Sequence, residues 1–196
     1  MIRKAFAAIA LLWVFAVPSQ AATITSFTAG VAGASTLYIG QSVTVPAGND
    51  WTDLSFNFFS DTSGGTTPSA AGTLFLLSSE YLGTPAGLSP LTPGFVAQST
   101  SIVGNVYFFD PAATVLGGTQ YFLYANAPVL VSGSNSGGYP GGSAYVAANA
   151  VSNFAPFAGD ANFLLSGTAV PEPASLLLLG IGLAGAGMRI RKQRSN

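Results

Sequence analysis

The chain has 196 residues, only 7% of them charged, and its formal net charge is -1 at pH 7. Its Lys and Arg residues all lie near the two ends, at Arg3, Lys4, Arg189, Arg191, Lys192 and Arg194. Because the stretch between has no basic residue, and the chain has no His or Cys, the composition excludes nucleic-acid binding, disulfides, and thiolate or imidazole chemistry.

Residues 1–21 have the three parts of a secretory signal peptide. Arg3 and Lys4 precede an apolar run at residues 5–17, and Ser19-Gln20-Ala21 supplies small residues where signal peptidase cuts. We therefore predict cleavage after Ala21 and export of the rest of the chain. An uncleaved membrane anchor is the alternative, but the apolar run is short for a transmembrane helix.

Residues 22–169 are predicted to form one domain of short β-strands. Apolar and polar residues alternate at 37–45 and 53–58. Gly- and Pro-rich breakers separate these runs from later ones that are rich in aromatic and β-branched residues, at 73–77, 106–109, 119–124, 144–147 and 162–166. We therefore expect an all-β fold, specifically an antiparallel jelly-roll-like β-sandwich.

Part of this domain also carries a likeness to known modules, at residues 39–46, 53–56, 72–77 and 116–123. These stretches resemble the β-sandwich modules that are common among anchored exported proteins of bacteria. The resemblance supports the sandwich and implies no particular ligand.

Acidic and amide side chains cluster in the turn that follows residues 37–45. Asn49, Asp50 and Asp53 offer the oxygen ligands that Ca²⁺ prefers, so a structural calcium ion is one hypothesis. The sequence has no D-x-D-x-D-G loop, and Asp or Asn in a turn usually bonds its own backbone. Turn formation is therefore the favoured interpretation, and we expect no obligatory cofactor.

Aromatic side chains suggest a second binding hypothesis, a flat platform for sugar rings. Trp51 follows the acidic turn, and Tyr139 lies in the longest Gly- and Ser-rich loop, at residues 132–142. Such rings have an apolar body and a polar tip, which suits a half-exposed platform. Packing of these rings inside the fold is the favoured alternative.

The domain offers few residues for catalysis. Ser-His-Asp and Ser-Lys arrangements need His or Lys, which the domain lacks. A glycosidase would have to pair Glu80, the one Glu of residues 22–169, with an Asp from a turn. We therefore expect no enzymatic activity.

The C-terminal segment, residues 170–196, has an organisation of its own. Val170-Pro171-Glu172-Pro173 precedes an apolar run at 174–188, and a basic cap follows with Arg189, Arg191, Lys192 and Arg194. A helix over the apolar run would span about 22 Å, against a hydrocarbon core of ~30 Å, and snorkelling basic side chains would extend it. We expect a single transmembrane helix with the cap in the cytoplasm and the domain outside the inner membrane.

This order of Val-Pro-Glu-Pro, apolar helix and Arg-rich end resembles the PEP-CTERM sorting tail of bacterial exosortase substrates. The resemblance covers residues 170–194, and Pro171, Glu172 and Pro173 match its signature. It implies that an exosortase-like membrane enzyme acts on the tail. The protein would then pass through the inner membrane to the cell surface or extracellular matrix of a Gram-negative bacterium. A plain single-pass anchor is the alternative.

These features together favour an exported, non-enzymatic protein with a structural or adhesive role at the cell surface or in the matrix. The alternative is a carbohydrate-binding module that recognises exopolysaccharide. The expected partners are the exosortase-like enzyme, the inner membrane and, under the alternative, exopolysaccharide; no nucleic acid is expected.

Overall fold

The computed structural model describes residues 20–28, 32–59, 70–134 and 138–170. The predicted signal peptide up to Ser19 lies outside the described residues, as do the motif from Pro171 onward, the predicted transmembrane helix and the basic cap. Within the described ranges, no helix has the length and apolar character needed to cross a membrane.

The described chain is built from β-strands and one short 3-10 turn, η1 (Pro85–Gly87), so the prediction of an all-β fold is confirmed. The strands are β1 (Ala21–Phe27), β2 (Ala32–Thr44), β3 (Trp51–Phe58), β4 (Leu74–Leu77), β5 (Phe95–Val103), β6 (Val106–Phe109), β7 (Gln120–Ala125), β8 (Val129–Ser134), β9 (Ala144–Ala147), β10 (Ala155–Phe157), β11 (Asp160–Ala161) and β12 (Phe163–Ala169).

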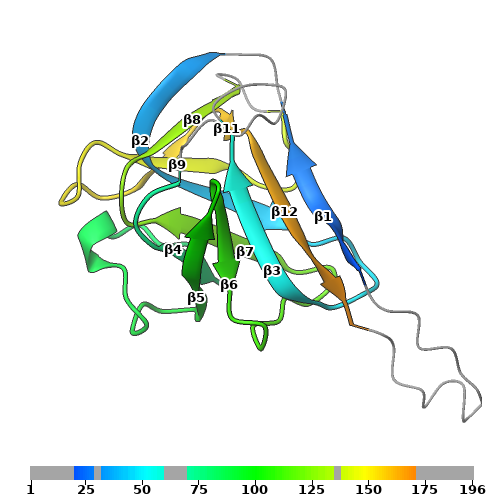
Figure 1. Cartoon of the computed structure of the whole chain (residues 1–196). Helices are drawn as coiled ribbons and strands as arrows, with labels where there is room; N and C mark the ends of the chain where they lie inside the picture. The colour runs from blue at the N-terminus through cyan, green and yellow to red at the C-terminus, as the bar shows by residue number, and fades with distance from the viewer. Residues whose placement is uncertain (1–19, 29–31, 60–69, 135–137, 171–196) are drawn as a thin grey trace, which may run out of the picture.

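The strands form one antiparallel sheet that curls until it nearly closes (Figure 1). Its order is β1-β12-β3-β6-β5-β4-β7-β2-β8-β11, and β9 pairs with β2 and β10. β11 and β12 follow each other along the chain, yet β11 pairs with β8 and β12 with β3, so this segment joins distant parts of the sheet. Backbone bonds from Phe59 N to Asn162 O, Asn162 N to Ser132 O and Ser132 N to Phe59 O complete the junction.

This architecture differs in one respect from the prediction. A jelly-roll-like sandwich has two separate sheets, whereas here a single hydrogen-bonded sheet wraps around the core. The physical reason is that two long strands turn the corners of the fold. β2 pairs with β8 through its first half and with β7 and β9 through its second, and β5 pairs first with β4 and then with β6. Register shifts in both strands allow the bend.

The concave face of the curled sheet buries the main hydrophobic core. Leu54, Phe56 and Phe58 of β3 are inside it, as their alternation with polar residues predicts. Phe56 stacks on Phe163 of β12, with ring centroids 5.6 Å apart, which fixes the β3–β12 pairing from within. Burial of each such side chain contributes about 1.5–3 kcal/mol.

A second, aromatic cluster packs on the other face of β4, β7 and β9. Its buried members include Tyr124, Tyr145 and Phe154, and the Tyr124 and Phe154 ring centroids are 4.8 Å apart. A Cβ at Gly40 of β2 would collide with the Tyr124 ring. The close crossing of ring and strand therefore requires glycine at this position.

Asp160 is a buried carboxylate that links three segments of the chain. Its Oδ1 accepts a hydrogen bond from Gln41 Nε2 at 3.3 Å, and its Oδ2 accepts one from the Tyr139 backbone N at 3.0 Å. Gln41 Oε1 in turn accepts from Ala161 N at 2.9 Å. Because these donors are uncharged, hydrogen bonding alone must offset the cost of burying the charge.

Candidate functional site

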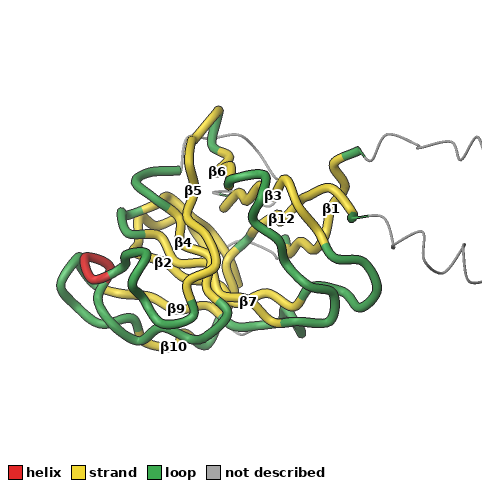
Figure 2. The backbone as a smooth tube through the Cα atoms, turned by 90° about the horizontal axis from the view of Figure 1, so that it is seen from below, coloured by secondary structure: helices red, strands yellow, loops and turns green. Residues whose placement is uncertain are grey.

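The C-terminal tail leaves the fold at one corner of the sheet, where β12 ends beside the first residues of β1 and β3. Ala21 pairs with Thr168, and Ala169 pairs with Trp51. The Val170 N–H then donates to the Asp50 carbonyl at 2.8 Å, so the sheet holds the chain up to the residue before Pro171. The described chain thus enters and leaves the fold side by side (Figures 1 and 2). We call this region, with the loops at 45–51 and 115–119, the tail corner.

Hydrogen bonds between the two loops make the tail corner rigid. Trp51 and Val115 exchange both backbone bonds at 2.9 Å, and Val45 N donates to Thr119 O at 2.9 Å. The Asp50 Oδ1 accepts from Gly117 N at 3.0 Å. A Cβ at Gly117 would lie only 2.8 Å from the Asn49 carbonyl oxygen, so the loops approach as closely as glycine permits.

The predicted calcium ligands lie in this same region. Asn49 and Asp53 are exposed, while one oxygen of Asp50 is occupied by the Gly117 N–H. Asp53 has a positive φ of 48°, a conformation that Asp tolerates better than most residues. No cluster of three or more His, Cys, Asp or Glu side chains suited to a metal occurs within the described ranges. Asp50 therefore links the two loops, Asp53 lies in β3, and calcium binding stays a prediction.

The two predicted sugar-platform residues lie in different settings and both pack against the main core. Trp51 is half-buried, and its Nε1 is buried without a hydrogen-bond partner. The Tyr139 ring meets the Phe163 ring edge-on at 5.1 Å, and its hydroxyl hydrogen-bonds with Thr25 Oγ1 at 3.1 Å and Thr44 N at 3.3 Å. Both rings therefore make the contacts of packing residues.

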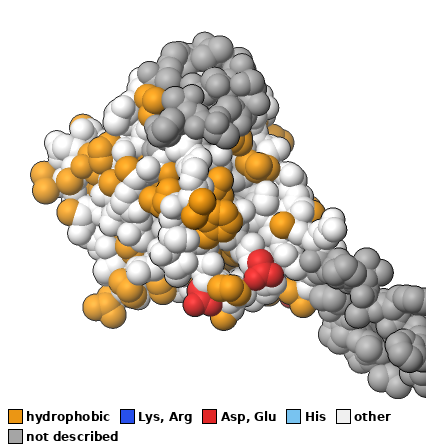
Figure 3. All heavy atoms as spheres, viewed as in Figure 1, with side chains coloured by type: hydrophobic (Ala, Val, Ile, Leu, Met, Phe, Trp, Pro, Cys, Tyr) orange, Lys and Arg blue, Asp and Glu red, His pale blue; other side chains and the backbone are white. Residues whose placement is uncertain are grey.

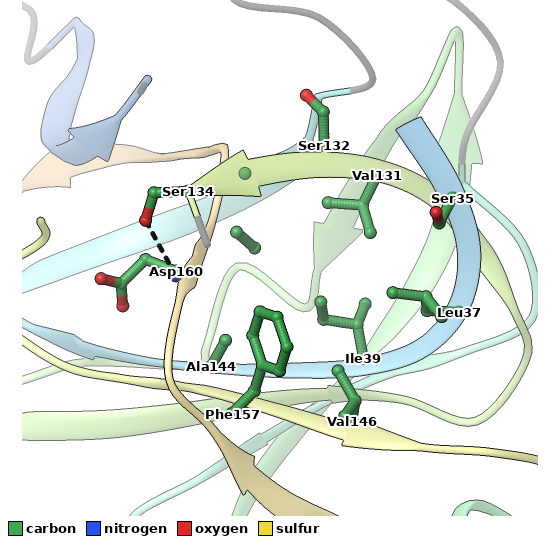
Figure 4. A pocket seen from close by; sticks show the side chains of 12 residues that line it. Ser35, Leu37, Ile39, Val131, Ser132, Ser134, Ala144, Val146, Phe157 and Asp160 are labelled. Carbon is green, nitrogen blue, oxygen red and sulfur yellow. Dashed lines mark hydrogen bonds between the residues drawn. The ribbon is translucent and has the colours of Figure 1, made fainter. Parts of the chain in front are cut away.

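A hollow that the sequence did not indicate lies between β2, β8 and β9 (Figure 4). Its cavity volume is about 120 Å³, and apolar side chains such as Leu37, Ile39 and Val131 line most of it. Phe157 of β10 is 42% exposed and points its ring into the hollow, with Asp160 to one side. The exposed ring gives the hollow an apolar face, Ser35 lies at its opposite end, and the Ser134 hydroxyl accepts a hydrogen bond from the Asp160 backbone N at 3.3 Å.

Glu80, the one residue considered for glycosidase chemistry, is exposed beside the aromatic cluster. Burial, and then a hydrogen bond and the charge of Glu80, raise the pKa of Tyr145 to about 12. Burial also raises the pKa of Tyr107 to about 12, and its hydroxyl donates to Ala71 O at 2.8 Å. Both phenols therefore stay protonated at neutral pH and serve as hydrogen-bond groups.

A comparison with protein families identifies the segment that begins at the tail corner. The family model described as the PEP-CTERM protein-sorting motif matches residues 169–192. The chain carries a PEP-CTERM sorting motif. This motif implies that the protein is exported and is processed by an exosortase at the membrane. No curated protein and no solved structure matches the chain.

The PEP-CTERM motif and the fold overlap. Ala169 and Val170 are the first residues of the match and the last residues of the described fold. The match includes the signature at 171–173 and the basic residues Arg189, Arg191 and Lys192, whereas Arg194 lies just beyond it.

The sequence predicted the PEP-CTERM motif. It did not predict the tail corner beside the motif or the hollow at Phe157. The Asn49-Asp50 and Gly117-Gly118 turns carry recognisable turn signals, but no local pattern shows that they meet. Phe157 likewise follows no pattern that distinguishes it from a core aromatic residue.

Proposed function

We propose that this PEP-CTERM protein has a structural or adhesive, non-enzymatic role at the cell surface or in the exopolysaccharide matrix. The observation that supports the proposal is an uncharged, partly apolar strand edge on the β5–β6 hairpin. A free strand edge is a ready template for pairing with another chain, and proteins that avoid such pairing usually protect it with charge. Here the sequence has no charged residue between Glu80 and Asp110.

Among the described residues, the hairpin leaves one edge of β5 without a strand partner. β5 pairs with β6 from Ser99 to Val103, and its pairing with β4 ends at Gln98. From Thr100 to Val103 the other edge therefore has no backbone partner among the described residues. Val103 is 65% exposed, with Ile102 and Phe108 also exposed. Figure 3 shows apolar side chains on the face formed by β3, β5 and β6.

The partner that fits this edge is a second copy of the chain. The edge of a β-strand is complementary to its own antiparallel copy, so two hairpins related by a two-fold axis would continue both sheets. The residues of the hairpin itself carry no charge, so they would not repel a second copy, although Asp53 of β3 lines the same hollow as Val103 and Phe108. Self-association through β5 would link copies of the exported protein to one another, as a structural or adhesive role requires.

Placing a cation on the edge tests this proposal. Val103→Lys is expected to weaken self-association of the released protein about tenfold or more, measured by sedimentation over a range of concentrations. Val151→Lys, at an exposed apolar residue of another loop, is the matched control and should behave as the native protein does. A native protein that stays monomeric at every concentration, or equal association of the two variants, would contradict the proposal.

Carbohydrate binding is the second candidate function, and the hollow at Phe157 is the observation that favours it. The exposed ring offers a stacking face for a sugar, and the lining of the hollow includes the hydroxyl group of Ser35. Trp51 and Tyr139 support carbohydrate binding less, because both rings pack against the main core. Binding of neutral exopolysaccharide that is lost in Phe157→Ala and retained in Val151→Ala would favour this function over self-association.

A further inference from the structure

The PEP-CTERM motif follows the fold without a spacer. Val170 is hydrogen-bonded within the tail corner, and Pro171 comes next. Even a fully extended chain places Pro173 no more than about 11 Å from Val170. An enzyme that grips residues 171–173 must therefore come within a few ångströms of the folded domain.

The surface that such an enzyme meets is preorganised. The loops at 45–51 and 115–119 are cross-linked by the bonds described above, and Gly117 allows them to pack without a gap. Leu116 is 51% exposed at this corner, and Val170 is 37% exposed. A rigid surface with an exposed apolar side chain loses little conformational entropy when it binds.

We propose that the tail corner is a docking surface for the membrane enzyme that processes the PEP-CTERM tail, with Leu116 as its apolar anchor. The inference rests on processing of the tail by that enzyme and adds that the folded domain contributes to recognition. Docking would hold residues 171–173 at the active site and raise their effective concentration there. The enzyme's contact surface would be apolar where it receives Leu116.

A lipid surface is the less favoured occupant of the tail corner. Anionic headgroups attract basic side chains, and every Lys and Arg of the chain lies outside the described residues. The corner instead carries the carboxylates of Asp50 and, beside it, Asp53. The charge at this corner therefore favours a protein partner over the bilayer.

The test measures the rate of tail processing of the full chain in cells that contain the enzyme. Leu116→Glu is expected to slow processing about fivefold or more, because a charge replaces the apolar anchor. Val151→Glu, 77% exposed in the loop beside η1, is the matched control and should be processed at the native rate. Equal rates for the two variants would overturn the proposal.

A second pair of variants separates docking from misfolding. A Gly- and Ser-rich segment inserted after Val170, ending in a copy of Ala169-Val170, keeps the motif intact and uncouples it from the corner. This insertion alone should slow processing, and adding Leu116→Glu to it should cause no further loss. If Leu116→Glu slows processing equally with and without the insertion, its effect does not pass through docking, and the proposal fails.

Two more measurements separate docking on the enzyme from contact with the bilayer, and failure of docking from failure of motif recognition. The slowing by Leu116→Glu should persist when enzyme and substrate are in detergent; its loss there would assign Leu116 to the bilayer and overturn the proposal. Replacement of residues 171–173 with alanines should block processing. If that replacement has no effect, recognition of residues 171–173 by the enzyme is refuted and the docking proposal falls with it. If it blocks processing while Leu116→Glu does not slow it, only docking is refuted.

Discussion

Replacing Pro171, Glu172 and Pro173 with alanines is expected to leave nearly all of the protein unprocessed in the inner membrane. Proline disfavours helical backbone at its own position and at the residue before it, and alanine at residues 171–173 would remove that restriction. The enzyme would then lose both this backbone restriction and the side chains of the motif. Immunoblotting of membrane and released fractions measures the effect.

The matched control for this variant changes prolines elsewhere on the surface. Pro90 and Pro93 are exposed residues of the loop after η1, and replacing both with alanine should leave processing at the native level. Normal processing and release of the variant altered at residues 171–173 would refute the sorting interpretation.

Asp160→Ala is expected to destabilise the fold by about 2–4 kcal/mol, because one N–H of the Gln41 amide and the Tyr139 backbone N–H lose their acceptor, while Gln41 Nε2 keeps its bond to Ser42 O. Removal of this carboxylate also frees the segment that joins β8 to β12, on which closure of the sheet depends. Urea unfolding of the protein recovered after release measures the change.

Asp53→Asn is the control for Asp160→Ala. It removes an exposed carboxylate and keeps a residue that tolerates a positive φ, so its free energy of unfolding should stay within about 0.5 kcal/mol of the native value. A loss of less than 1 kcal/mol in Asp160→Ala would show that the buried network contributes little to the fold.

Alternation of apolar and polar residues predicted β2 and β3, because an inward-facing row of side chains leaves a period of two in the sequence, and runs of aromatic and β-branched residues predicted β4, β6, β7, β9 and β12. Leu54, Phe56 and Phe58 are the clearest case, and they line the core as expected. β1, β5, β8, β10 and β11 were not predicted. From Ser101 to Val103 the side chains of β5 are exposed on both faces, so its sequence has no alternation to detect.

The path of the sheet could not be predicted, because it depends on pairings between residues far apart in the sequence. β1 pairs with β12, and the loop at Asp50 bonds with the turn at Gly117. Periodicity shows which face of a strand is buried and not which strand lies beside it. A single sheet that closes on itself and a sandwich of two sheets therefore have the same local pattern.

The PEP-CTERM motif was predicted in full because its information is local. Proline, charge and hydropathy at residues 170–194 define it without reference to the fold. The sequence could not decide the sugar-platform hypothesis, because tertiary packing determines whether Trp51 and Tyr139 face solvent or the core. The Tyr139 hydroxyl, bonded to Thr25 and Thr44, shows how a loop aromatic becomes part of the interior.

Intact-mass measurement of the protein recovered from outside the cells tests the central claim most directly, because it locates both ends of the mature chain at once. We expect an N-terminus at Ala22 and a C-terminus that lacks the basic cap at 189–194. A mature protein that retains both Met1 and Asn196 would contradict export through a signal peptide and sorting through the tail.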